Sequence, residues 1–407
     1  MLQGKTIILG VTGSIAAYKT ACLAGALNKQ HADVHVIMTE NATRFISPLT
    51  FETLTGNRCP VGIFDRDVKD GVTHIALAKA ADLIMVAPAS ADFIAKTAGG
   101  IADDMLTTVI LAANCSKYIV PAMNSNMLLN PVTQDNIDKL KHYGFKIIEP
   151  ESGRLACGDI GVGKMPDPDV LVKYIDREKA MYKDMEGLKV LVTAGPTREE
   201  IDPVRFITNH SSGKMGYALA QVCMLRGADV CLVSGPSSVA PPDFVKRIPV
   251  VSAAEMYEAV TAEAKDADLI FMAAAVSDYT PKTRAENKIK KTGSDISLGL
   301  ERTKDILGEI SHNRGKGAGT GRQIICGFSM ETENLLKNSK EKFERKALDM
   351  IAANSIASGD SGFETDTNTV TLITPAKELE LGKLSKFETA KRISSEALLM
   401  LEGESIK

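Results

Sequence analysis

The same local pattern occurs twice in this chain, about half its length apart. In the first half an apolar strand at residues 5–11 (KTIILGV) leads through Thr12-Gly13-Ser14 into a helical pattern that begins at Ile15. In the second half a strand at residues 189–193 (KVLVT) leads through Ala194-Gly195-Pro196 toward another helix. Strand, glycine turn and helix in this order begin a βαβ unit, so the repetition predicts two domains of one general type.

A second strand follows the first helix in each half, at residues 33–39 (DVHVIMT) and 229–235 (DVCLVSG). Further buried strands are expected later in the two halves, at residues 81–90, 117–124, 145–150, 268–279 and 323–332. The segment 91–113 is expected to be helical. Such alternation is typical of parallel sheets covered by helices. We therefore expect an α/β fold with two tandem doubly wound, mostly parallel-sheet domains.

A charged segment at residues 176–186 separates the two halves. It has no sustained apolar face, and it follows a short helix expected near residues 170–175. We interpret this segment as a linker, which places the domains at residues 1–180 and 187–407. A chain of 407 residues is long enough for two or three domains, each with a full core.

The composition is that of an ordinary soluble enzyme. A net charge of −3 gives no bias toward nucleic acid or a membrane surface. No stretch reaches the roughly 18 unbroken apolar residues of a membrane helix, and the N-terminus enters a strand rather than a signal peptide. The seven cysteines include no C-x-x-C pair, so neither a disulfide framework nor a zinc site is predicted. We expect a cytoplasmic protein that binds no nucleic acid and no membrane.

The glycine turns predict where ligands bind. In open α/β sheets the binding site lies beyond the carboxyl ends of the strands. The spacing Gly10-x-x-Gly13 is not the G-x-G-x-x-G dinucleotide fingerprint, and no Walker motif is present. A helix that starts after Thr12-Gly13-Ser14 can nevertheless bind a phosphate through its free N–H groups. A single phosphate, as in flavin mononucleotide, fits such a turn better than a pyrophosphate.

A series of motifs in the first half resembles one enzyme family. The flavin-containing cysteine decarboxylases, and specifically the phosphopantothenoylcysteine decarboxylase domain, share these motifs in order: Gly13-Ser14-Ile15-Ala16, His74, Pro121-Ala122-Met123-Asn124-x-x-Met127, Ala156-Cys157-Gly158 and Gly161-x-Gly163-Lys164-Met165. The resemblance implies a flavodoxin-like domain that binds FMN and converts 4′-phosphopantothenoylcysteine to 4′-phosphopantetheine. It implies that His74 assists the oxidation next to the flavin, that Asn124 binds the substrate carboxylate, and that Cys157 returns a proton from a mobile flap. The flavin contacts that it implies are Gly13, Ser14, Ile15, Thr39, Ser90 and Ala122.

The second half resembles phosphopantothenate–cysteine ligase. The motifs that carry this resemblance are Ile207-Thr208-Asn209-His210-Ser211-Ser212-Gly213-Lys214-Met215-Gly216, Ala273-Ala274-Ala275-Val276-Ser277-Asp278-Tyr279 and Lys288-Ile289-Lys290-Lys291. They imply a Rossmann-like domain that activates 4′-phosphopantothenate with CTP and transfers the acyl group to L-cysteine. Asp278 is implied in a Mg²⁺ site, Lys288 in charge stabilisation, and Arg205 and Asn209 at the acyl phosphate. The nucleotide contacts that it implies are Ala273, Ala274, Ala275, Asp278, Lys288, Lys304, Asp305, Ile306, Leu307, Phe328, Lys342 and Lys346.

Together the two halves resemble the bacterial and archaeal bifunctional coenzyme A biosynthesis proteins over nearly the whole chain. In that family the decarboxylase domain is a trimer with FMN at subunit contacts and the ligase domain is a dimer, which implies a dodecamer. Two alternatives stay open at this point. One is a flavin-binding regulator of the same fold that has lost catalysis, and the other is a tandem of nicotinamide-dependent reductases. The latter conflicts with the missing fingerprint.

Overall fold

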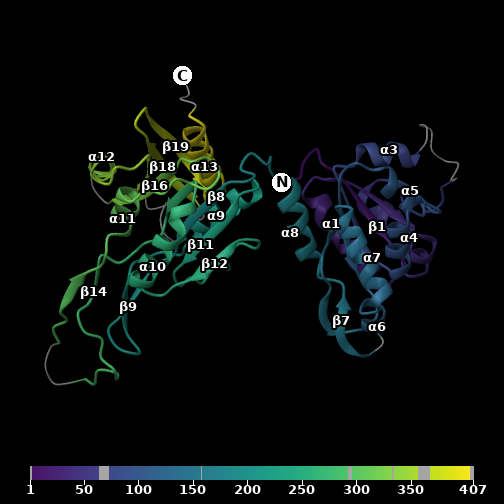
Figure 1. Ribbon diagram of the computed structural model, residues 1–407, viewed down its shortest axis with the longest axis horizontal. Coiled ribbons are helices and arrows are strands. Elements are labelled where there is room, and N and C mark those ends of the chain that lie inside the picture. The colour runs from purple at the N-terminus through teal and green to yellow at the C-terminus, as the bar shows by residue number, and fades with distance from the viewer. Residues whose placement is uncertain are drawn as a thin grey trace. The chain divides into compact units, whose positions relative to one another are not determined.

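The computed structural model describes residues 2–63, 73–156, 158–291, 296–331, 334–355 and 367–403 (Figure 1). The chain forms two compact units, Met1–Met181 and Tyr182–Lys407. Each unit has its own central sheet and its own hydrophobic core. The α/β fold class with two tandem, mostly parallel sheets is therefore confirmed.

The first unit contains a five-stranded parallel sheet. Its strands are β1 (Thr6–Val11), β2 (Asp33–Met38), β3 (Leu83–Ala89), β4 (Ser116–Pro121) and β5 (Lys146–Ile147). The spatial order β2-β1-β3-β4-β5 is the flavodoxin-like order 2-1-3-4-5. The strand order reverses between β1 and β3, so a crevice for a ligand is expected at the carboxyl ends of these two strands.

Helices cover both faces of this sheet because alternate residues of the strands point to opposite sides. Ile7 and Leu9 of β1 face one core and Ile8 faces the other. The first core is closed by α1 (Ala17–Lys29), α2 (Pro48–Thr55) and α8 (Pro168–Lys179). The second core is closed by α3 (Thr73–Ala80), α4 (Ala91–Gly99), α5 (Met105–Ala112) and α7 (Pro131–His142). A 3₁₀ turn, η1 (Glu40–Arg44), follows β2.

Two local predictions for the first unit need correction. The segment 91–113 forms two helices rather than one, because Gly100 ends α4 in the left-handed conformation and Asp104 begins α5 with a capping box. The expected linker 176–186 is partly helical, since α8 continues to Lys179. Its later part belongs to the second unit, where the Arg226 guanidinium binds both carboxylate oxygens of Asp184 at 2.8 Å.

A short helix and a hairpin extend the first unit beyond the sheet. Helix α6 (Ser125–Leu128) follows β4, and strands β6 (Glu151–Arg154) and β7 (Ile160–Lys164) form an antiparallel pair. Cys157 lies between these strands in the sequence and outside the described residues. We call β6, β7 and their connection the flap hairpin.

The second unit contains an eight-stranded sheet in the order β12-β11-β8-β13-β16-β17-β18-β19. The parallel strands are β8 (Lys189–Ala194), β11 (Asp229–Ser234), β12 (Lys246–Pro249), β13 (Leu269–Met272), β16 (Ile324–Glu331) and β17 (Met350–Ser355). They follow the Rossmann order 3-2-1-4-5-6, with the reversal between β8 and β13. Antiparallel strands β18 (Thr367–Ile373) and β19 (Glu378–Ser385) complete one edge.

The helices of the second unit, as far as the chain is described, pack on this sheet in three groups. Helices α10 (Ala253–Glu263) and α11 (Ile306–His312) close one core, together with the 3₁₀ turn η2 (Ala264–Asp266). Helices α9 (Lys214–Leu225) and α13 (Lys386–Glu402) pack against each other and against the sheet. Helix α12 (Leu335–Arg345) packs on β16 and β17.

The strand expected at residues 268–279 is shorter than predicted. Strand β13 ends at Met272, and residues 273–278 leave the sheet to run beside the loop after β8. Two small antiparallel pairs extend from this region: β9 (Arg198–Glu200) with β10 (Phe206–Thr208), and β14 (Tyr279–Pro281) with β15 (Leu300–Arg302). In Figure 1, β9 and β14 project together from the body of the second unit.

Candidate functional sites

Hydrogen bonds join the loops after β1 and β3 at the first switch point. The buried Thr12 hydroxyl donates to the carbonyl oxygen of Pro88 at 2.8 Å and accepts from the backbone N–H of Ser90 at 2.9 Å. Ser90 then caps α4 by accepting from the Phe93 N–H at 3.3 Å. The two loops that carry the predicted flavin contacts are thus held together at one point of the sheet edge.

Gly13 lies where the first loop passes Asn41. A Cβ atom added at Gly13 would lie 2.7 Å from the Asn41 Cβ, so only glycine fits at this position. Ser14 accepts a hydrogen bond from the Ala16 N–H at 3.4 Å at the start of α1, and Ile15 is exposed. The turn therefore presents backbone N–H groups and a serine beside the N-terminus of α1, an arrangement that suits an anion.

Thr39 and Ala122 complete the predicted flavin contacts. Thr39 follows β2, and its hydroxyl oxygen is buried without a hydrogen-bond partner. A buried hydroxyl without a partner is costly, so this atom fits a ligand that supplies one. Ala122 follows β4, is 5% exposed, and donates its N–H to the carbonyl oxygen of Ala89 at 3.1 Å. Four loops thus bring these residues to one edge of the sheet.

The flap hairpin is bound to the loop that carries Asn124. The Met123 N–H donates to the carbonyl oxygen of Gly163 at 3.2 Å, and the Ser125 hydroxyl donates to that of Val162 at 2.6 Å. A Cβ atom at Gly163 would lie 2.1 Å from the Met123 carbonyl oxygen, and the φ angle of Gly163 is +130°. Asn124 itself caps α6 by accepting from the Asn126 N–H at 2.9 Å. The hairpin therefore lies beside Asn124.

His74 lies in the first turn of α3, which packs against α5. Among the described residues, no hydrogen bond or ion pair joins His74 to the other predicted residues. Cys157 lies outside the described residues, between Ala156 and Gly158 of the flap hairpin. The backbone on either side of it is closed by a hydrogen bond from the Leu155 N–H to the Asp159 carbonyl oxygen at 2.8 Å.

Threonine hydroxyls also join the loops at the second switch point. Thr193, at the end of β8, accepts from the Ala274 N–H at 3.1 Å, and Thr197 accepts from the Ser277 N–H at 3.0 Å. The Ala275 N–H donates to the carbonyl oxygen of Gly195 at 3.0 Å. The three predicted alanines, Ala273, Ala274 and Ala275, therefore line the point where the strand order reverses.

Glycines let three backbone segments approach one another at this point. A Cβ atom at Gly235, after β11, would lie 1.9 Å from the carbonyl oxygen of Pro196. Gly195 and Gly213 both have positive φ angles, +76° and +77°, and a Cβ at Gly213 would lie 3.2 Å from the Gly195 nitrogen. Gly213 also begins α9. Backbone atoms therefore shape this part of the site.

Asn209 and Arg205 reach the same region from β10 and the turn before it. The Asn209 amide donates to the carbonyl oxygens of Val276 at 3.0 Å and Ala275 at 3.4 Å. Arg205 donates to the carbonyl oxygen of Ile289 at 2.5 Å, so it contacts the segment that contains Lys288. Both Asn209 and Arg205 are exposed.

Lys288 and Asp278 are also exposed. The backbone carbonyl of Asp278 accepts from the Thr303 N–H at 3.0 Å, which ties the Asp278 loop to the end of β15. Within the described ranges, no group of three or more histidine, cysteine, aspartate or glutamate side chains could hold a metal ion. Asp278 supplies one exposed carboxylate, and Mg²⁺ is commonly held by one or two carboxylates together with substrate phosphates.

Lys346 and Lys342 are each held by a bond to another element. Lys346, just after α12, forms an ion pair with Asp305, and Lys342 donates to the carbonyl oxygen of Phe328 at 2.8 Å. Asp305 also accepts from the Gly308 N–H at 3.0 Å. Burial opposes ionisation of Asp305, but its bonds with Lys346 and Gly308 lower the pKa of this carboxyl below its usual range.

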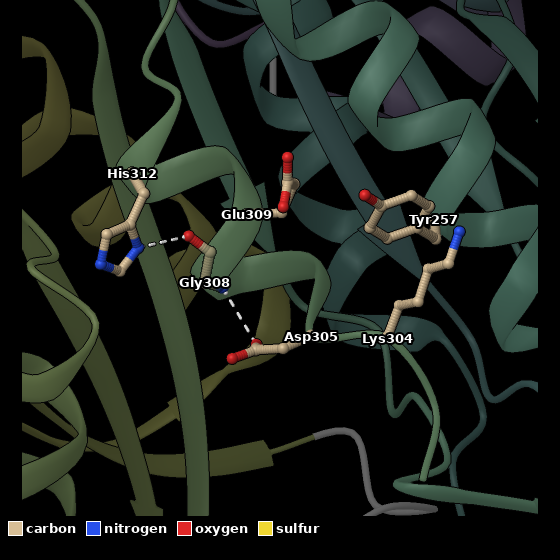
Figure 2. Close-up of a pocket in the computed structure, with 6 residues that line it drawn as sticks. All are labelled: Tyr257, Lys304, Asp305, Gly308, Glu309 and His312. Carbon is tan, nitrogen blue, oxygen red and sulfur yellow. Dashed lines mark hydrogen bonds between the residues drawn. The ribbon is translucent and has the colours of Figure 1, made fainter.

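A pocket of about 380 Å³ opens beside these residues, lined by Tyr257, Lys304, Asp305, Gly308, Glu309 and His312. Figure 2 shows the Lys304 ammonium beside the Tyr257 ring, 4.4 Å from the ring centroid, and Asp305 at the start of α11. Ile306 and Leu307 lie in the first turn of α11, where Ile306 is buried and Leu307 packs against the core. The predicted residues 304–307 therefore contribute two polar side chains and two core contacts.

Sequence reasoning missed several residues that shape these sites. The most important are Thr193, Gly235 and Asp202; Thr12 is predicted only as part of the first glycine turn. One signal was available, because a threonine stands at the end of the first strand in each half. Gly235 matters because its backbone approaches Pro196, 39 positions away, and Asp202 matters because it bonds to Ile289, 87 positions away.

Two family models match the chain: Flavoprotein over residues 1–179, and DNA/pantothenate metabolism flavoprotein C-terminal domain over residues 185–400. The coenzyme A biosynthesis bifunctional protein CoaBC of Haemophilus influenzae is 42% identical over 397 residues, which cover 98% of each chain. The CoaBC protein of Bacillus subtilis is 43% identical over 410 residues, 99% of this chain and 100% of that protein.

Two solved structures are similar to single halves. The C-terminal domain of a CoaBC protein is 37% identical over 55% of this chain and 100% of that chain, with a TM-score of 0.46. The FMN-dependent cysteine decarboxylase SpaF is 32% identical over 41% of this chain and 93% of that chain, with a TM-score of 0.37.

The first unit thus has a flavoprotein domain with a flavodoxin-like sheet, and the second a pantothenate-metabolism domain with a Rossmann-ordered sheet. The match to whole bifunctional relatives covers both units. The chain belongs to the CoaBC family of bifunctional coenzyme A biosynthesis proteins. This result supports the enzyme over the regulatory flavin-binding protein considered above. Within the part of the chain described, no helix is long and apolar enough to span a membrane.

Proposed function

We propose that each switch point is one active site of a bifunctional enzyme of coenzyme A biosynthesis. The second unit joins 4′-phosphopantothenate to L-cysteine with CTP, and the first unit decarboxylates the product to 4′-phosphopantetheine with FMN. The main support for this proposal is that residues predicted to contact ligands lie on separate loops that meet where the strand order reverses. These points lie between β1 and β3 and between β8 and β13. Ligands of open α/β sheets bind at such points.

The first site fits FMN. Gly13, Ser14 and Ile15 supply a loop for the phosphate at the N-terminus of α1, and Ser90 and Ala122 border the same edge. The unpaired Thr39 hydroxyl supplies a hydrogen bond to the flavin. When bound, the flavin accepts electrons during oxidation of the substrate and so makes loss of CO₂ feasible.

Three side chains of this unit act on the substrate. Asn124 orients the substrate carboxylate through its amide, which adds no positive charge that would oppose decarboxylation. His74 assists the initial oxidation as a proton acceptor. Cys157 gives back a proton at the end of the reaction. The bonds from Met123 and Ser125 to β7 bring the described part of the flap hairpin beside the loop that carries Asn124.

The second site forms an acyl-cytidylate from 4′-phosphopantothenate and CTP, with release of pyrophosphate, and the amine of cysteine then attacks the acyl carbon. Negative charge develops at the α-phosphate during the first step, and Lys288 stabilises it. Arg205 and Asn209 hold the acyl phosphate. The contact of the Asn209 amide with residues 275–276 supports this role.

The nucleotide is held by side chains from several elements. Lys342 and Lys346 bind the triphosphate after they exchange their present bonds with Phe328 and Asp305. Lys304, Ile306 and Leu307 border the same region. Asp278 would contribute one carboxylate to a Mg²⁺ ion, which would neutralise charge on the nucleotide phosphates. The choice of CTP over other nucleotides is part of this proposal.

Exposed apolar side chains support an oligomer. In the first unit Ile15 and Tyr18, at the start of α1, and Phe45 and Leu49, after η1, are all at least half exposed, which suits subunit contacts of a trimer. In the second unit the projecting strands expose Phe206 and Leu300, which suits a dimer. Trimeric and dimeric contacts together give a dodecamer. We expect the enzyme in the cytoplasm, with its small-molecule substrates.

One assay tests the proposal. Purified protein is incubated with 4′-phosphopantothenate, cysteine, CTP and Mg²⁺, and pyrophosphate, CO₂ and 4′-phosphopantetheine are measured. We expect all three products in equal amounts and flavin absorbance in the purified protein. Pyrophosphate without CO₂ would reject the decarboxylase assignment, and CO₂ only from added 4′-phosphopantothenoylcysteine would reject the ligase assignment.

A further inference from the structure

Asp202 is a buried carboxylate that lies outside all the predicted contacts. It is 1% exposed and follows β9 in the projecting part of the second unit. One carboxylate oxygen accepts from the Val204 and Arg205 N–H groups, at 2.8 and 2.9 Å. The other accepts from the Ile289 N–H at 3.1 Å and lies 3.4 Å from the Arg205 Nε. Asp202 therefore joins the turn at residues 202–205 to the segment that contains Lys288.

The Ile289 N–H belongs to the same peptide group as the Lys288 carbonyl. Arg205 also donates to the Ile289 carbonyl oxygen at 2.5 Å, so both polar groups of the Ile289 backbone are fixed by this turn. Burial of Asp202 opposes ionisation. The hydrogen bonds from Val204, Ile289 and Arg205 outweigh it and lower the pKa of the carboxyl below its usual range, so the group is an anion at neutral pH.

Other bonds also join the segment after β9 to the segment that contains Lys288, but they hold Lys288 less directly. Arg284 pairs with Glu200 at 2.5 Å, but both side chains are well exposed, and exposed ion pairs contribute little. The Ala285 N–H donates to the Ile201 carbonyl oxygen at 2.9 Å, three residues before Lys288. Asp202 is thus the buried contact next to Lys288 itself.

We propose that Asp202 is a positioning residue of the ligase reaction: it holds the Lys288–Ile289 peptide against the turn that carries Arg205, and so sets where the Lys288 ammonium and the Arg205 guanidinium meet the α-phosphate. This inference rests on the proposed function of the second unit. Asp202 does not touch the substrate, since its carboxylate is buried and occupied by these hydrogen bonds.

The test is a double-mutant cycle in the full-length protein. Asp202→Asn places an amide NH₂ against at least one N–H donor, and Lys288→Gln removes the ammonium. Formation of acyl-cytidylate from 4′-phosphopantothenate and CTP is followed by rapid quench without cysteine. We expect Asp202→Asn to slow this step by about tenfold or more when Lys288 is present. The same change should slow it by less than about threefold when combined with Lys288→Gln, because residues that act as a unit are not additive.

The control is Glu199→Gln, which replaces a buried carboxyl group of β9 with an amide. Glu199 accepts from the Ala253 N–H at 2.9 Å, on the side of α10. We expect this variant to keep the rate of the step within about twofold. Hydrogen exchange of the Ile289 amide should accelerate by about tenfold or more in Asp202→Asn and not in Glu199→Gln. If Asp202→Asn unfolds the second unit, Ile289→Pro replaces it in the cycle, because this change removes the N–H that Asp202 accepts and leaves the carboxylate in place.

The outcomes separate this inference from the proposed function. If Lys288→Gln forms the intermediate at the normal rate, the proposed role of Lys288 is wrong. If Lys288→Gln is slow but Asp202→Asn has the same effect with and without Lys288, or no effect at all, Asp202 does not act through Lys288 and the inference is overturned.

Discussion

The two switch points share one kind of hydrogen bond but are lined by different groups. In both units a threonine at the end of the first strand accepts a backbone N–H from the loop across the reversal: Thr12 from Ser90, and Thr193 from Ala274. The first site is then lined by residues from four loops, and the Thr39 hydroxyl among them is buried without a partner. The second site is lined by backbone at the glycines 195, 213 and 235, and its Ser277 hydroxyl is likewise buried without a partner.

This difference suits the ligands that we propose. A flavin that stays bound can satisfy a buried hydroxyl such as that of Thr39 permanently. A substrate nucleotide must enter and leave in every cycle. Backbone groups at the glycines of the second site can bind the phosphates of such a ligand, and the Ser277 hydroxyl there, which is also buried without a partner, offers a further hydrogen bond. The predictions below test this contrast between the units.

His74→Asn should have the largest effect and should act on the first unit alone. We expect CO₂ release to fall by about 10²- to 10⁴-fold, the usual contribution of a positioned acid or base. Flavin should remain, because His74 lies on α3 and not on the loops that carry Ser14, Thr39 and Ser90. Absorbance and CO₂ release are measured on the same sample. A folded variant without flavin would instead make His74 a cofactor contact.

Gly235→Ala should act on the ligase alone. The new Cβ would lie 1.9 Å from the Pro196 carbonyl oxygen, and backbone cannot move aside as a side chain can. We expect about a hundredfold loss of pyrophosphate release, the cost of a displacement of about 1 Å in a catalytic site. CO₂ release from added 4′-phosphopantothenoylcysteine should stay normal.

The control for Gly235→Ala is the matched change Gly13→Ala in the first unit. Its Cβ would lie 2.7 Å from the Asn41 Cβ, a side-chain atom, so Asn41→Gly in the same protein should restore part of the flavin content. Flavin absorbance per protein measures this. If Gly13→Ala lowers the flavin content equally with and without Asn41→Gly, the proposed difference between the two sites is contradicted.

Asp184→Ala should destabilise the second unit by about 1.5–3 kcal/mol and spare the first, because it removes the carboxylate that accepts two hydrogen bonds from the Arg226 guanidinium, although Asp184 itself is exposed. The Arg226 side chain that it binds is nearly fully buried. Denaturant unfolding, with flavin release as the signal for the first unit and CTP binding for the second, measures this. A change in flavin release would show that the segment 182–186 also stabilises the first unit.

Asn209→Asp should slow conversion of the acyl-cytidylate more than its formation, by about ten- to a hundredfold, or ~1.5–3 kcal/mol. A carboxylate cannot donate to the carbonyl oxygens of Ala275 and Val276, and its charge repels the acyl phosphate. Mass spectrometry of quenched reactions, with and without cysteine, should detect accumulated intermediate. Normal CTP binding without any intermediate would assign Asn209 to the activation step.

Glu178→Gln should have the smallest effect and should change only the first unit. Burial raises the pKa of Glu178, but bonds from Lys146, Ser116 and Tyr118 outweigh burial and lower it to about 2. Because the pKa of Glu178 is lower in the folded protein than its unfolded value of about 4.5, the ionised carboxylate stabilises the fold at pH values above about 4.5. This stabilisation is lost as pH falls toward 2. After allowance for solvent screening, we expect Glu178→Gln to lose about 2 kcal/mol at neutral pH and progressively less in acid, measured by urea unfolding. A pH-independent loss would assign Glu178 a packing role.

Much of the fold could be predicted from local pattern. The glycine turns after residues 11 and 194 marked the strand ends that became the two candidate sites, because an apolar run that stops at glycine is a local signal. The break at Gly100 and the continuation of α8 to Lys179 were missed. In α8 the buried Leu171 and Ile175 extend a helical face into a segment whose charges suggested a linker.

The sequence by itself determined the two α/β halves, the family and the residue types available at each strand end. Only the tertiary structure decided which of these residues meet. Thr12 bonds to Ser90 across 78 positions and Asp202 to Ile289 across 87, and no periodicity reports such pairs. The physical reason is that a parallel sheet joins strands through long crossovers, so its carboxyl edge gathers loops that are distant in the chain.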